Sequence, residues 1–228
     1  MAEYTIDVIE SAPFGQMCYV ISASDRTDAV VVDPGFDVQT ILELLQHDGR
    51  TLAAILNTHA HVDHIAGNEA LKKAYPDAPI IIGRNEAQLL TDPYRNLGAS
   101  FGIKVSSPAA DRLVDDGERL EVGGFTFEVR EIPGHSPGSV VYLCDDYSPA
   151  FVFGGDVLFA GSIGRTDFPE GDHQALLTGI VEKLLSLPDD TRIHPGHGPV
   201  TTVGAEKRSN AWIRDFLAKM QGAEPEAS

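Results

Sequence analysis

Cysteine and long apolar stretches are both scarce in this sequence. The 228 residues include only Cys18 and Cys144, too few for the disulfide framework of a small secreted protein. No apolar stretch approaches the roughly 20 residues that a transmembrane helix requires. The first residues, MAEYTIDVIE, lack the basic segment and apolar core of a secretory signal. We therefore expect a cytoplasmic protein with no membrane attachment.

Basic residues are few as well. Lys and Arg number 17 against 34 Asp and Glu, which gives a formal net charge of −17 with neutral histidine. Such a charge repels phosphate groups and anionic lipids, so we expect no nucleic-acid partner and no membrane partner. Hydrophobic residues make up 43% and charged residues 22%, a balance that excludes an intrinsically disordered chain and a coiled coil.

The order of apolar patterns predicts a layered α/β or α+β domain. Short strand-like segments alternate with amphipathic helical segments in the first third, and strands dominate from residue 112 onward. We expect one domain over residues 1–228, whose last residues, 221–228, form a frayed tail. Strands are expected at 4–9, 17–21, 29–32, 52–56, 80–82, 112–114, 119–122, 125–132, 140–144, 150–153 and 191–194, and helices at 38–46, 65–74, 175–185 and 205–220.

Residues 84–108 follow no regular pattern. They contain Pro93, Gly98, Gly102 and Pro108, with aromatic and aliphatic side chains between them. A long loop of this kind is often a lid or a pocket wall. The same side chains would also suit packing into the main core, and both interpretations stay open at this point.

Three of the eight histidines lie within six residues, in THAHVDH at residues 58–64. His59 and His61 are two residues apart, so in extended backbone they point to one side and can chelate one cation. Asp63 and His64 lie where the chain turns into the next predicted helix, and they would face a neighbouring position. Asp63 would also suit that helix as a simple capping residue. Because a cation relieves the repulsion among clustered imidazoles, the pattern H-x-H-x-D-H predicts a metal site.

Three glycine-rich turns, each after a predicted strand, carry one further donor each. PGHSPG at residues 133–138 contains His135, GGD at 154–156 contains Asp156, and PGHGP at 195–199 contains His197. Glycine allows a close approach of the backbone. An aspartate after two glycines is usually a turn residue when taken alone. Together with the histidine cluster, however, the turns complete a set of seven donors.

These motifs resemble the metallo-β-lactamase superfamily over almost the whole chain. GDVLF at 155–159, GRTDF at 164–168 and PGHGP with the following TT at 201–202 are similar to the glyoxalase II-like (hydroxyacylglutathione hydrolase-like) branch, in particular its short bacterial members. The resemblance implies a four-layer αββα sandwich with the metals at one edge of its two sheets. It also implies a binuclear site, with the first metal on His59, His61 and His135, the second on Asp63, His64 and His197, and Asp156 bridging both.

Such a centre implies a metal-dependent hydrolase. Two divalent cations, zinc by first expectation and iron or manganese as alternatives, would share a hydroxide that attacks the substrate carbonyl. Asp63 would be a ligand and also the residue that orients this water or accepts its proton. The branch implies a small-molecule thioester of the S-D-lactoylglutathione type as the substrate. Three other histidines match no ligand position, and these are His47, His173 and His194.

Two alternative functions stay open. Persulfide dioxygenases share the GRTDF motif and hold a single Fe(II) by two histidines and one aspartate, which here would be His59, His135 and Asp156. The intact His197 favours the binuclear hydrolase over this alternative. A non-catalytic metal-binding scaffold is a minor alternative, which the absence of cysteine from the predicted ligand set disfavours.

Arg165 is the candidate for binding the substrate's thiol carrier. It lies where longer glyoxalase II enzymes have a basic residue that grips glutathione, and a guanidinium binds carboxylates well. An ion pair with Asp167 or Glu170 is the alternative. Residues 198–228 leave room for one helix rather than the C-terminal helical domain of the longer enzymes, so the carrier stays open between glutathione and another thiol. Candidates for an apolar pocket rim, with core packing as the alternative, are Phe14, Tyr94, Phe101 and Phe159.

Overall fold

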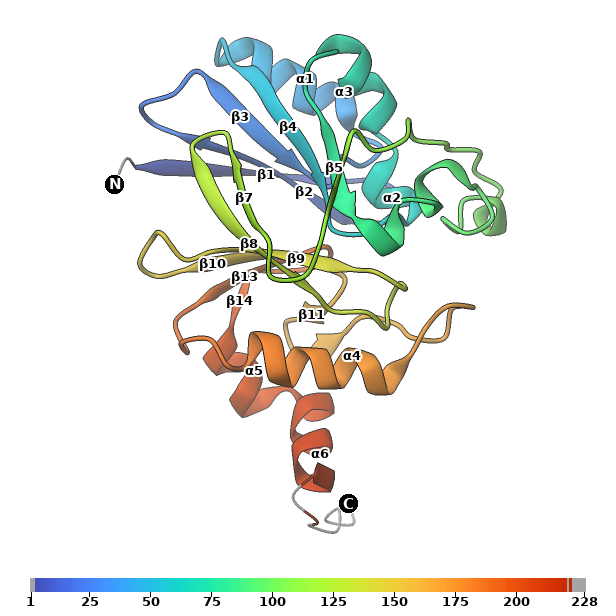
Figure 1. Ribbon diagram of the computed structural model, residues 1–228, viewed down its shortest axis with the longest axis vertical. Coiled ribbons are helices and arrows are strands. Elements are labelled where there is room, and N and C mark those ends of the chain that lie inside the picture. Colours follow the sequence, from blue (N-terminus) through green and yellow to red (C-terminus); the bar gives the residue numbers. More distant parts are fainter. Residues whose placement is uncertain (1–2, 221, 223–228) are drawn as a thin grey trace.

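Two six-stranded sheets form the centre of the molecule in the computed structural model, which describes residues 3–220 and 222 (Figure 1). The predicted frayed tail, 221–228, lies outside the described residues apart from Gly222. The first sheet has the order β1-β2-β3-β4-β5-β6, with β1 (Tyr4–Ser11), β2 (Gln16–Ala23), β3 (Asp28–Val32), β4 (Thr51–Asn57), β5 (Ile80–Gly83) and β6 (Arg112–Val114). The second has the order β14-β13-β10-β9-β8-β7, with β7 (Arg119–Val122), β8 (Phe125–Glu131), β9 (Val140–Cys144), β10 (Phe151–Gly155), β13 (Arg192–Pro195) and β14 (Thr201–Thr202).

Helices cover the outer face of each sheet (Figure 1). On the first sheet these are α1 (Val38–His47) and α3 (Asn68–Ala74), and on the second they are α4 (His173–Gly179), its π-helical continuation η4 (Ile180–Leu184), α5 (Val203–Ser209) and α6 (Ala211–Met220). Short elements complete the chain: α2 (Val62–Ile65), the hairpin β11 (Leu158–Phe159) and β12 (Ser162–Ile163), and the 3-10 helices η1 (Arg84–Glu86), η2 (Leu89–Thr91) and η3 (Ala99–Phe101). The predicted four-layer αββα sandwich is thus confirmed.

Strands that are apolar on both faces explain this layering. In β9, Val140, Tyr142 and Cys144 pack in the cluster between the two sheets, whereas Val141 and Leu143 pack against the helices. All five side chains are at most 1% exposed. A strand with this pattern is stable only when both its faces are covered, which requires a layer on each side.

Three predicted helices differ from the observed ones. The helix predicted at 65–74 is two helices, α2 and α3, which are separated by a turn at Ala66 and Gly67. There the Gly67 amide donates to the Pro34 carbonyl at 2.8 Å, and a Cβ on Gly67 would come within 2.9 Å of the Gly35 carbonyl oxygen. The helix predicted at 205–220 is interrupted at Asn210, whose backbone is extended while its side chain donates to the Ser162 carbonyl. The helix predicted at 175–185 begins earlier, at His173, and continues as the π-helix η4. β11, β12 and β14 have no counterpart among the predicted strands.

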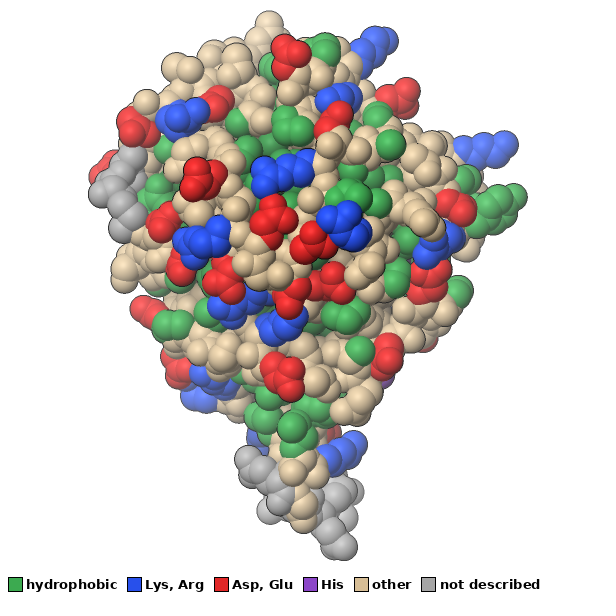
Figure 2. All heavy atoms as spheres, in the orientation of Figure 1, with side chains coloured by type: hydrophobic (Ala, Val, Ile, Leu, Met, Phe, Trp, Pro, Cys, Tyr) green, Lys and Arg blue, Asp and Glu red, His purple; other side chains and the backbone are tan. Residues whose placement is uncertain are grey.

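Charged side chains of both signs are interspersed over the face of the molecule in Figure 2, and the basic ones do not gather into one patch there. Within residues 3–220, no helix has the length and apolar character that crossing a membrane requires.

Candidate metal centre

All seven predicted ligands lie together at one end of the sandwich. They follow the ends of four strands, with His59, His61, Asp63 and His64 after β4, His135 after β8, Asp156 after β10 and His197 after β13. β10 is parallel to β13, and β8 and β10 both run antiparallel to β9. The strands β8, β10 and β13 therefore point the same way, and their carboxyl ends meet at one edge of the sheet. Hydrogen bonds join β4 to that edge: the Val140 amide donates to the Thr58 carbonyl at 2.8 Å, and the Tyr142 hydroxyl donates to the Asn57 carbonyl at 3.0 Å.

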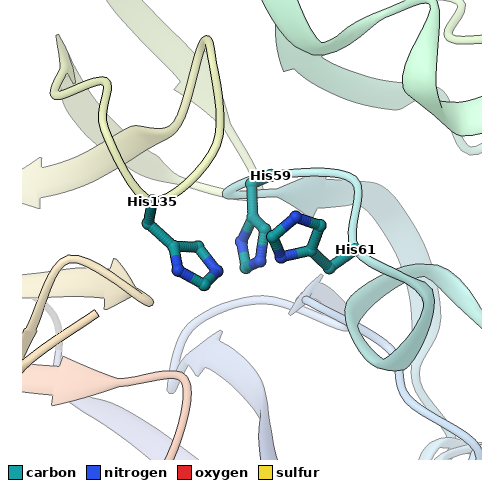
Figure 3. Close-up of side chains that lie close together, drawn as sticks. All are labelled: His59, His61 and His135. Atoms are coloured by element: carbon teal, nitrogen blue, oxygen red, sulfur yellow. The ribbon is translucent and has the colours of Figure 1, made fainter. Parts of the chain in front are cut away.

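His59, His61 and His135 form the first donor group, and their rings turn toward one another from two loops (Figure 3). One ligand atom from each residue lies within 4.8 Å of the other two. The ring centroid of His61 is 4.6 Å from that of His59 and 4.6 Å from that of His135. Convergent imidazoles of this kind suit zinc or iron.

Asp63, His64 and His197 form the second donor group. Oδ2 of Asp63 lies 3.2 Å from Nε2 of His197 and 3.8 Å from Nε2 of His64. Asp156 lies between the two groups. Its Oδ2 is 3.4 Å from Nε2 of His135 in the first group and 3.5 Å from Nε2 of His197 in the second. Its Oδ1 is 3.4 Å from Nε2 of His64. The fold therefore assembles the ligand set that the resemblance implies. Asp63 is in the first turn of α2 but does not cap it, because the N-cap residue is His61.

Unpaired buried atoms test whether these residues fit a cation. Among the described residues, Nε2 of His59, His64 and His135 and Oδ1 of Asp156 are buried without a hydrogen-bond partner. Buried polar atoms without partners are uncommon, because their desolvation is then uncompensated. Each of the four is an atom that ligates metals, and a cation in each group would pair them. The residues present therefore fit the divalent cations that the resemblance implies.

The opposite nitrogen, Nδ1, of the same three rings is held by a hydrogen bond. His135 Nδ1 donates to the Arg165 carbonyl at 2.8 Å, and His64 Nδ1 donates to Asp33 at 3.0 Å. His59 Nδ1 lies 3.1 Å from the hydroxyl of the preceding threonine, whose own proton goes to Asp33. Because these oxygens keep a proton on Nδ1, Nε2 is the nitrogen with which each ring can ligate a metal once it is neutral.

Asp33 is a residue of the centre that sequence reasoning missed. Its buried carboxylate accepts from the Thr58 amide at 2.7 Å, from the Thr58 hydroxyl at 2.6 Å and from His64 Nδ1. A carboxylate oxygen of Asp33 also lies within 4.8 Å of a ring nitrogen of His59 and of His64. Three donors already occupy the oxygens of Asp33, however, so it orients ligands instead. It follows β3 in the sequence Asp-Pro-Gly with a φ of +50°, and the turn signal of that tripeptide concealed its role.

Glu86, in η1, is a second buried carboxylate that sequence reasoning missed. It accepts from the amides of Ala60 at 3.0 Å and Gly138 at 2.7 Å and from the Ser136 hydroxyl. These donors belong to the two loops that carry the first donor group, so Glu86 ties the loops together. Burial raises the pKa of this carboxyl group, and the three hydrogen bonds oppose the rise. No sequence signal marks Glu86, because residues 84–108 are irregular.

The first donor group is held in the neutral form. Burial, reinforced by the neighbouring imidazoles, lowers the pKa of His59 well below its ordinary value. Burial likewise lowers the pKa of His61 to about 3, and it lowers the pKa of His135 against the opposing charge of Asp156. The neutral imidazole is the form that binds a metal, so the three rings are ready to do so at neutral pH.

The second donor group is dominated by its carboxylates. Burial opposes a charge on His64, but Asp63, Asp156 and Asp33 together raise the pKa of His64 well above its ordinary value. A hydrogen bond with Asp63 raises the pKa of His197 in spite of burial. In return, the histidines lower the pKa of both Asp63 and Asp156 against their burial. A cation would compete here with the imidazole protons, so metal binding is linked to pH.

A cavity of about 290 Å³ opens at the centre. Arg165 is the only Lys or Arg among its lining residues, and its guanidinium donates to Asp167 at 2.9 and 2.8 Å. This is the ion pair held as the alternative for Arg165, and both side chains are exposed, 65% and 68%. Three of the four candidate rim residues lie in the wall of this cavity, together with a fourth aromatic ring: Phe14, Phe101, Phe159 and Phe168.

A smaller cavity of about 140 Å³ adjoins the first and is lined by the remaining rim candidate, Tyr94, which is 78% exposed. Residues 84–108 supply walls to both cavities, while Leu89 and Leu90 from the same segment are buried in the core. The aromatic side chains for which both interpretations were open, Tyr94 and Phe101, are exposed and line the cavities, so they do not pack into the core. The partition between the cavities consists of the residues that line both, His61, Leu97, His135 and Phe168.

The remaining histidines lie apart from this centre. The side chain of His47 is 87% exposed, as expected of a surface residue. The His173 ring packs against Trp212 with a centroid distance of 5.5 Å. His194 packs against Tyr19 at 5.3 Å, in the core between the sheets.

Residues 12–197 match the model of the metallo-beta-lactamase superfamily. The chain belongs to this superfamily. It is 39% identical over 205 residues to the probable metallo-hydrolase YqgX of Bacillus subtilis, covering 90% of this chain and 95% of that protein. It is 36% identical over 211 residues to the hydroxyacylglutathione hydrolase GloC of Haemophilus influenzae, covering 91% and 97% of the two chains. The predicted relationship to the glyoxalase II-like branch is confirmed.

Solved structures agree with this assignment. The BLEG-1 B3 metallo-β-lactamase is 39% identical, with a TM-score of 0.86 over 92% of this chain and 99% of that one. A di-iron-bound form of TTHA1623 is 37% identical, with a TM-score of 0.78 over 90% and 99%. ETHE1 from Myxococcus xanthus is 26% identical, with a TM-score of 0.74 over 97% and 92%. The protein is therefore a metallo-hydrolase of this superfamily, with grouped His and Asp side chains as its candidate metal ligands.

Proposed function

We propose that this metallo-hydrolase is a binuclear thioesterase of the glyoxalase II type. The observation that carries the proposal is the second donor group, Asp63, His64 and His197, beside the three-histidine group, with Asp156 between them. A mononuclear iron site of two histidines and one aspartate would leave the second group without a role. The similarity to the hydroxyacylglutathione hydrolase GloC supports the same conclusion. Zinc is our first expectation for the metal, with iron or manganese as alternatives, and a di-iron-bound relative makes iron a necessary part of any test.

The chain's own residues would perform most of the steps. Two divalent cations bound here would lower the pKa of a water molecule and polarise the substrate carbonyl. Asp63 lines the larger cavity and is kept ionised by His64 and His197, so its carboxylate would orient the attacking water and accept its proton. Attack on the carbonyl carbon breaks the C–S bond and releases a carboxylic acid and a thiolate. A thiolate is a good leaving group, so no dedicated acid is needed.

Arg165 is the residue that we assign to the thiol carrier. Its ion pair with Asp167 is solvent-exposed, and such pairs contribute little free energy. A substrate carboxylate would therefore displace Asp167 at small cost and bind the guanidinium through two hydrogen bonds. The similarity to GloC favours glutathione as the carrier, and another thiol with a carboxylate would be held in the same way.

The test combines elemental analysis with a substrate panel. Protein loaded with zinc, iron or manganese is assayed on S-D-lactoylglutathione, on thioesters of other thiols, on a chromogenic cephalosporin and on glutathione persulfide. We expect two metals per chain and thioester hydrolysis that both His59→Ala and His197→Ala reduce by at least 100-fold.

A different pattern would establish a different function. Persulfide dioxygenase, which the similarity to ETHE1 keeps in the panel, requires one iron per chain, sulfite release and activity that survives His197→Ala. Cephalosporin hydrolysis without thioesterase activity would point to the chemistry named for BLEG-1. If no substrate were turned over with any metal, the non-catalytic scaffold would be the better description.

A further inference from the structure

The smaller cavity beside the centre differs in chemistry from the larger one. Its charged side chains are already paired, since Arg95 donates from Nε and Nη2 to the two carboxylate oxygens of Glu170, both at 2.9 Å. The Ser136 hydroxyl is likewise committed, because it donates to Glu86. The rest of the wall away from the imidazoles is largely apolar, with Leu89, Leu97, Pro137, Phe168 and Pro169. A cavity with satisfied polar groups and apolar walls favours an uncharged, apolar occupant.

The position of this cavity ties it to the reacting atoms. Its inner wall includes His61 and His135, two members of the first donor group. The Phe168 ring packs edge-on against both imidazoles, with centroids 5.3 Å from His61 and 5.8 Å from His135. The larger cavity is lined by the same two histidines and, unlike the smaller one, also by Asp63, Asp156, His197 and Arg165. A thioester whose carbonyl lies at the centre has two substituents, the acyl chain and the thiol carrier, which point away from each other. Each would enter one of the two cavities, which the partition around Phe168 separates.

We propose that the smaller cavity is the acyl subsite and the larger cavity receives the thiol carrier, with Phe168 as the residue that separates them. This inference rests on the proposed thioesterase function and adds the class of acyl group. Of the two cavities, only the larger one is lined by Arg165. The thiol carrier is the part of the substrate that bears carboxylates, so we place the carrier in the larger cavity and the acyl group in the smaller one. The opposite orientation would place an apolar acyl chain beside Arg165 and a charged carrier beside Arg95. The Arg95–Glu170 pair is less exposed, 35% and 40%, than the Arg165–Asp167 pair, 65% and 68%, so a carrier would displace it less readily.

The size of the cavity sets a limit on the acyl chain. Its volume of about 140 Å³ is close to the roughly 150 Å³ apolar cavity of another protein that binds benzene. The subsite therefore accepts an acyl substituent of about six carbon atoms, aliphatic or phenyl. Three of its lining residues reach solvent, since Tyr94 is 78% exposed and the side chains of Arg95 and Glu170 are 35% and 40% exposed. A longer chain would have to displace the Arg95–Glu170 ion pair.

The experiment measures kcat/KM for the metal-loaded enzyme on glutathione thioesters from acetyl to decanoyl, with benzoyl included. For the wild type we expect a rise up to hexanoyl and benzoyl and then a fall on the order of tenfold for decanoyl. The double variant Arg95→Ala/Glu170→Ala removes two partly exposed side chains that line the smaller cavity but not the larger one, and it should restore decanoyl hydrolysis. The matched variant Phe101→Ala removes an exposed side chain that lines only the larger cavity. It should keep the wild-type acyl limit and change KM across a series of thiols instead.

The outcomes separate the subsite from the function. An acyl limit that moves with Phe101→Ala, and stays fixed in Arg95→Ala/Glu170→Ala, would reverse the orientation and overturn the inference while the thioesterase stands. A wild type that hydrolyses all chain lengths equally would also overturn it. A wild type that hydrolyses no thioester at all would remove the proposed function, and the subsite with it. Equal metal content and melting temperature in all variants show that each change is local.

Discussion

His194 makes the stability of the fold sensitive to acid, and replacing it tests the packing between the sheets. The side chain is 8% exposed, packs against Tyr19 and Phe153, and its Nδ1 has no hydrogen-bond partner within the described part of the chain. Burial, with a contribution from Arg192, lowers the pKa of His194 to about 4. The folded protein therefore resists protonation of His194. The unfolded chain accepts the proton once the pH falls below about 6.5, the ordinary pKa of histidine.

The sign and size of the effect follow from these two pKa values. Both states are neutral well above pH 6.5, so the contribution to stability is intact there. It is lost progressively as the pH falls through about 6.5 toward 4. The full difference corresponds to about 3 kcal/mol, and about 2 kcal/mol of it is lost between pH 7.5 and pH 5. His194→Gln removes the titrating group with a side chain of similar size. Between pH 7.5 and pH 5, the wild type should therefore lose about 2 kcal/mol more free energy of unfolding than this variant loses.

Urea unfolding at a series of pH values measures the difference. His47→Gln is the matched control, because it makes the same chemical change at a side chain that is 87% exposed, and its pH profile should follow the wild type. Terms from the metal centre are common to all three proteins and cancel. If His194→Gln and the wild type lose stability in parallel as the pH falls, burial does not hold His194 neutral and the reasoning is wrong.

Three further substitutions test the metal centre. Asp33→Asn removes the charge that orients His64, and we expect a 10- to 100-fold loss of metal affinity in chelator competition, with the second metal lost first. Glu86→Gln places an amide NH₂ group against one of three donors, and it should lower the free energy of unfolding by about 1–3 kcal/mol in urea titrations. Gly196→Ala introduces a Cβ that collides with Asp156 Oδ1, so elemental analysis should find the folded protein, checked by circular dichroism, short of one metal. Unchanged metal affinity in Asp33→Asn, full metal occupancy in Gly196→Ala, or unchanged stability in Glu86→Gln would contradict the role assigned to that residue.

The strands were predictable because their faces are buried on both sides. Continuous apolar runs such as Val140–Cys144 can exist only between two layers, and the predicted bounds of this strand match the observed ones. The helices were less predictable, because their interruptions have tertiary causes. At Gly67 the chain packs against the Gly35 carbonyl, and at Asn210 a side-chain hydrogen bond to the Ser162 carbonyl competes with the helix. Helical periodicity continues through both points and does not register such contacts.

The donor residues were predictable for a different reason. Four of them lie within one short segment, and the others follow strand ends in glycine-rich turns, so local sequence alone marks them. Asp33 and Glu86 carry no such mark, because each acts through contacts with segments more than 20 residues away. The partner of Arg165 could not be predicted from the sequence. A charged side chain on an exposed loop has several nearby partners of similar energy, and Asp167 is the one with which it pairs.

Asp33 and Glu86 illustrate two uses of a buried carboxylate. Glu86 accepts only from neutral groups, two amides and a hydroxyl, so its contribution is geometric: it sets the distance between the loops of the first donor group. Asp33 accepts from the His64 imidazole as well as from neutral donors, so it adds negative charge beside the second group. A charge placed there raises the basicity of His64 and favours a cation at that group over an empty one. In the first group, His59 and His135 donate to neutral acceptors, the Thr58 hydroxyl and the Arg165 carbonyl, so Asp33 reaches this group only through the Thr58 hydroxyl. Loss of Asp33 should therefore weaken the second metal more than the first, a selectivity that a purely structural role for Asp33 would not produce.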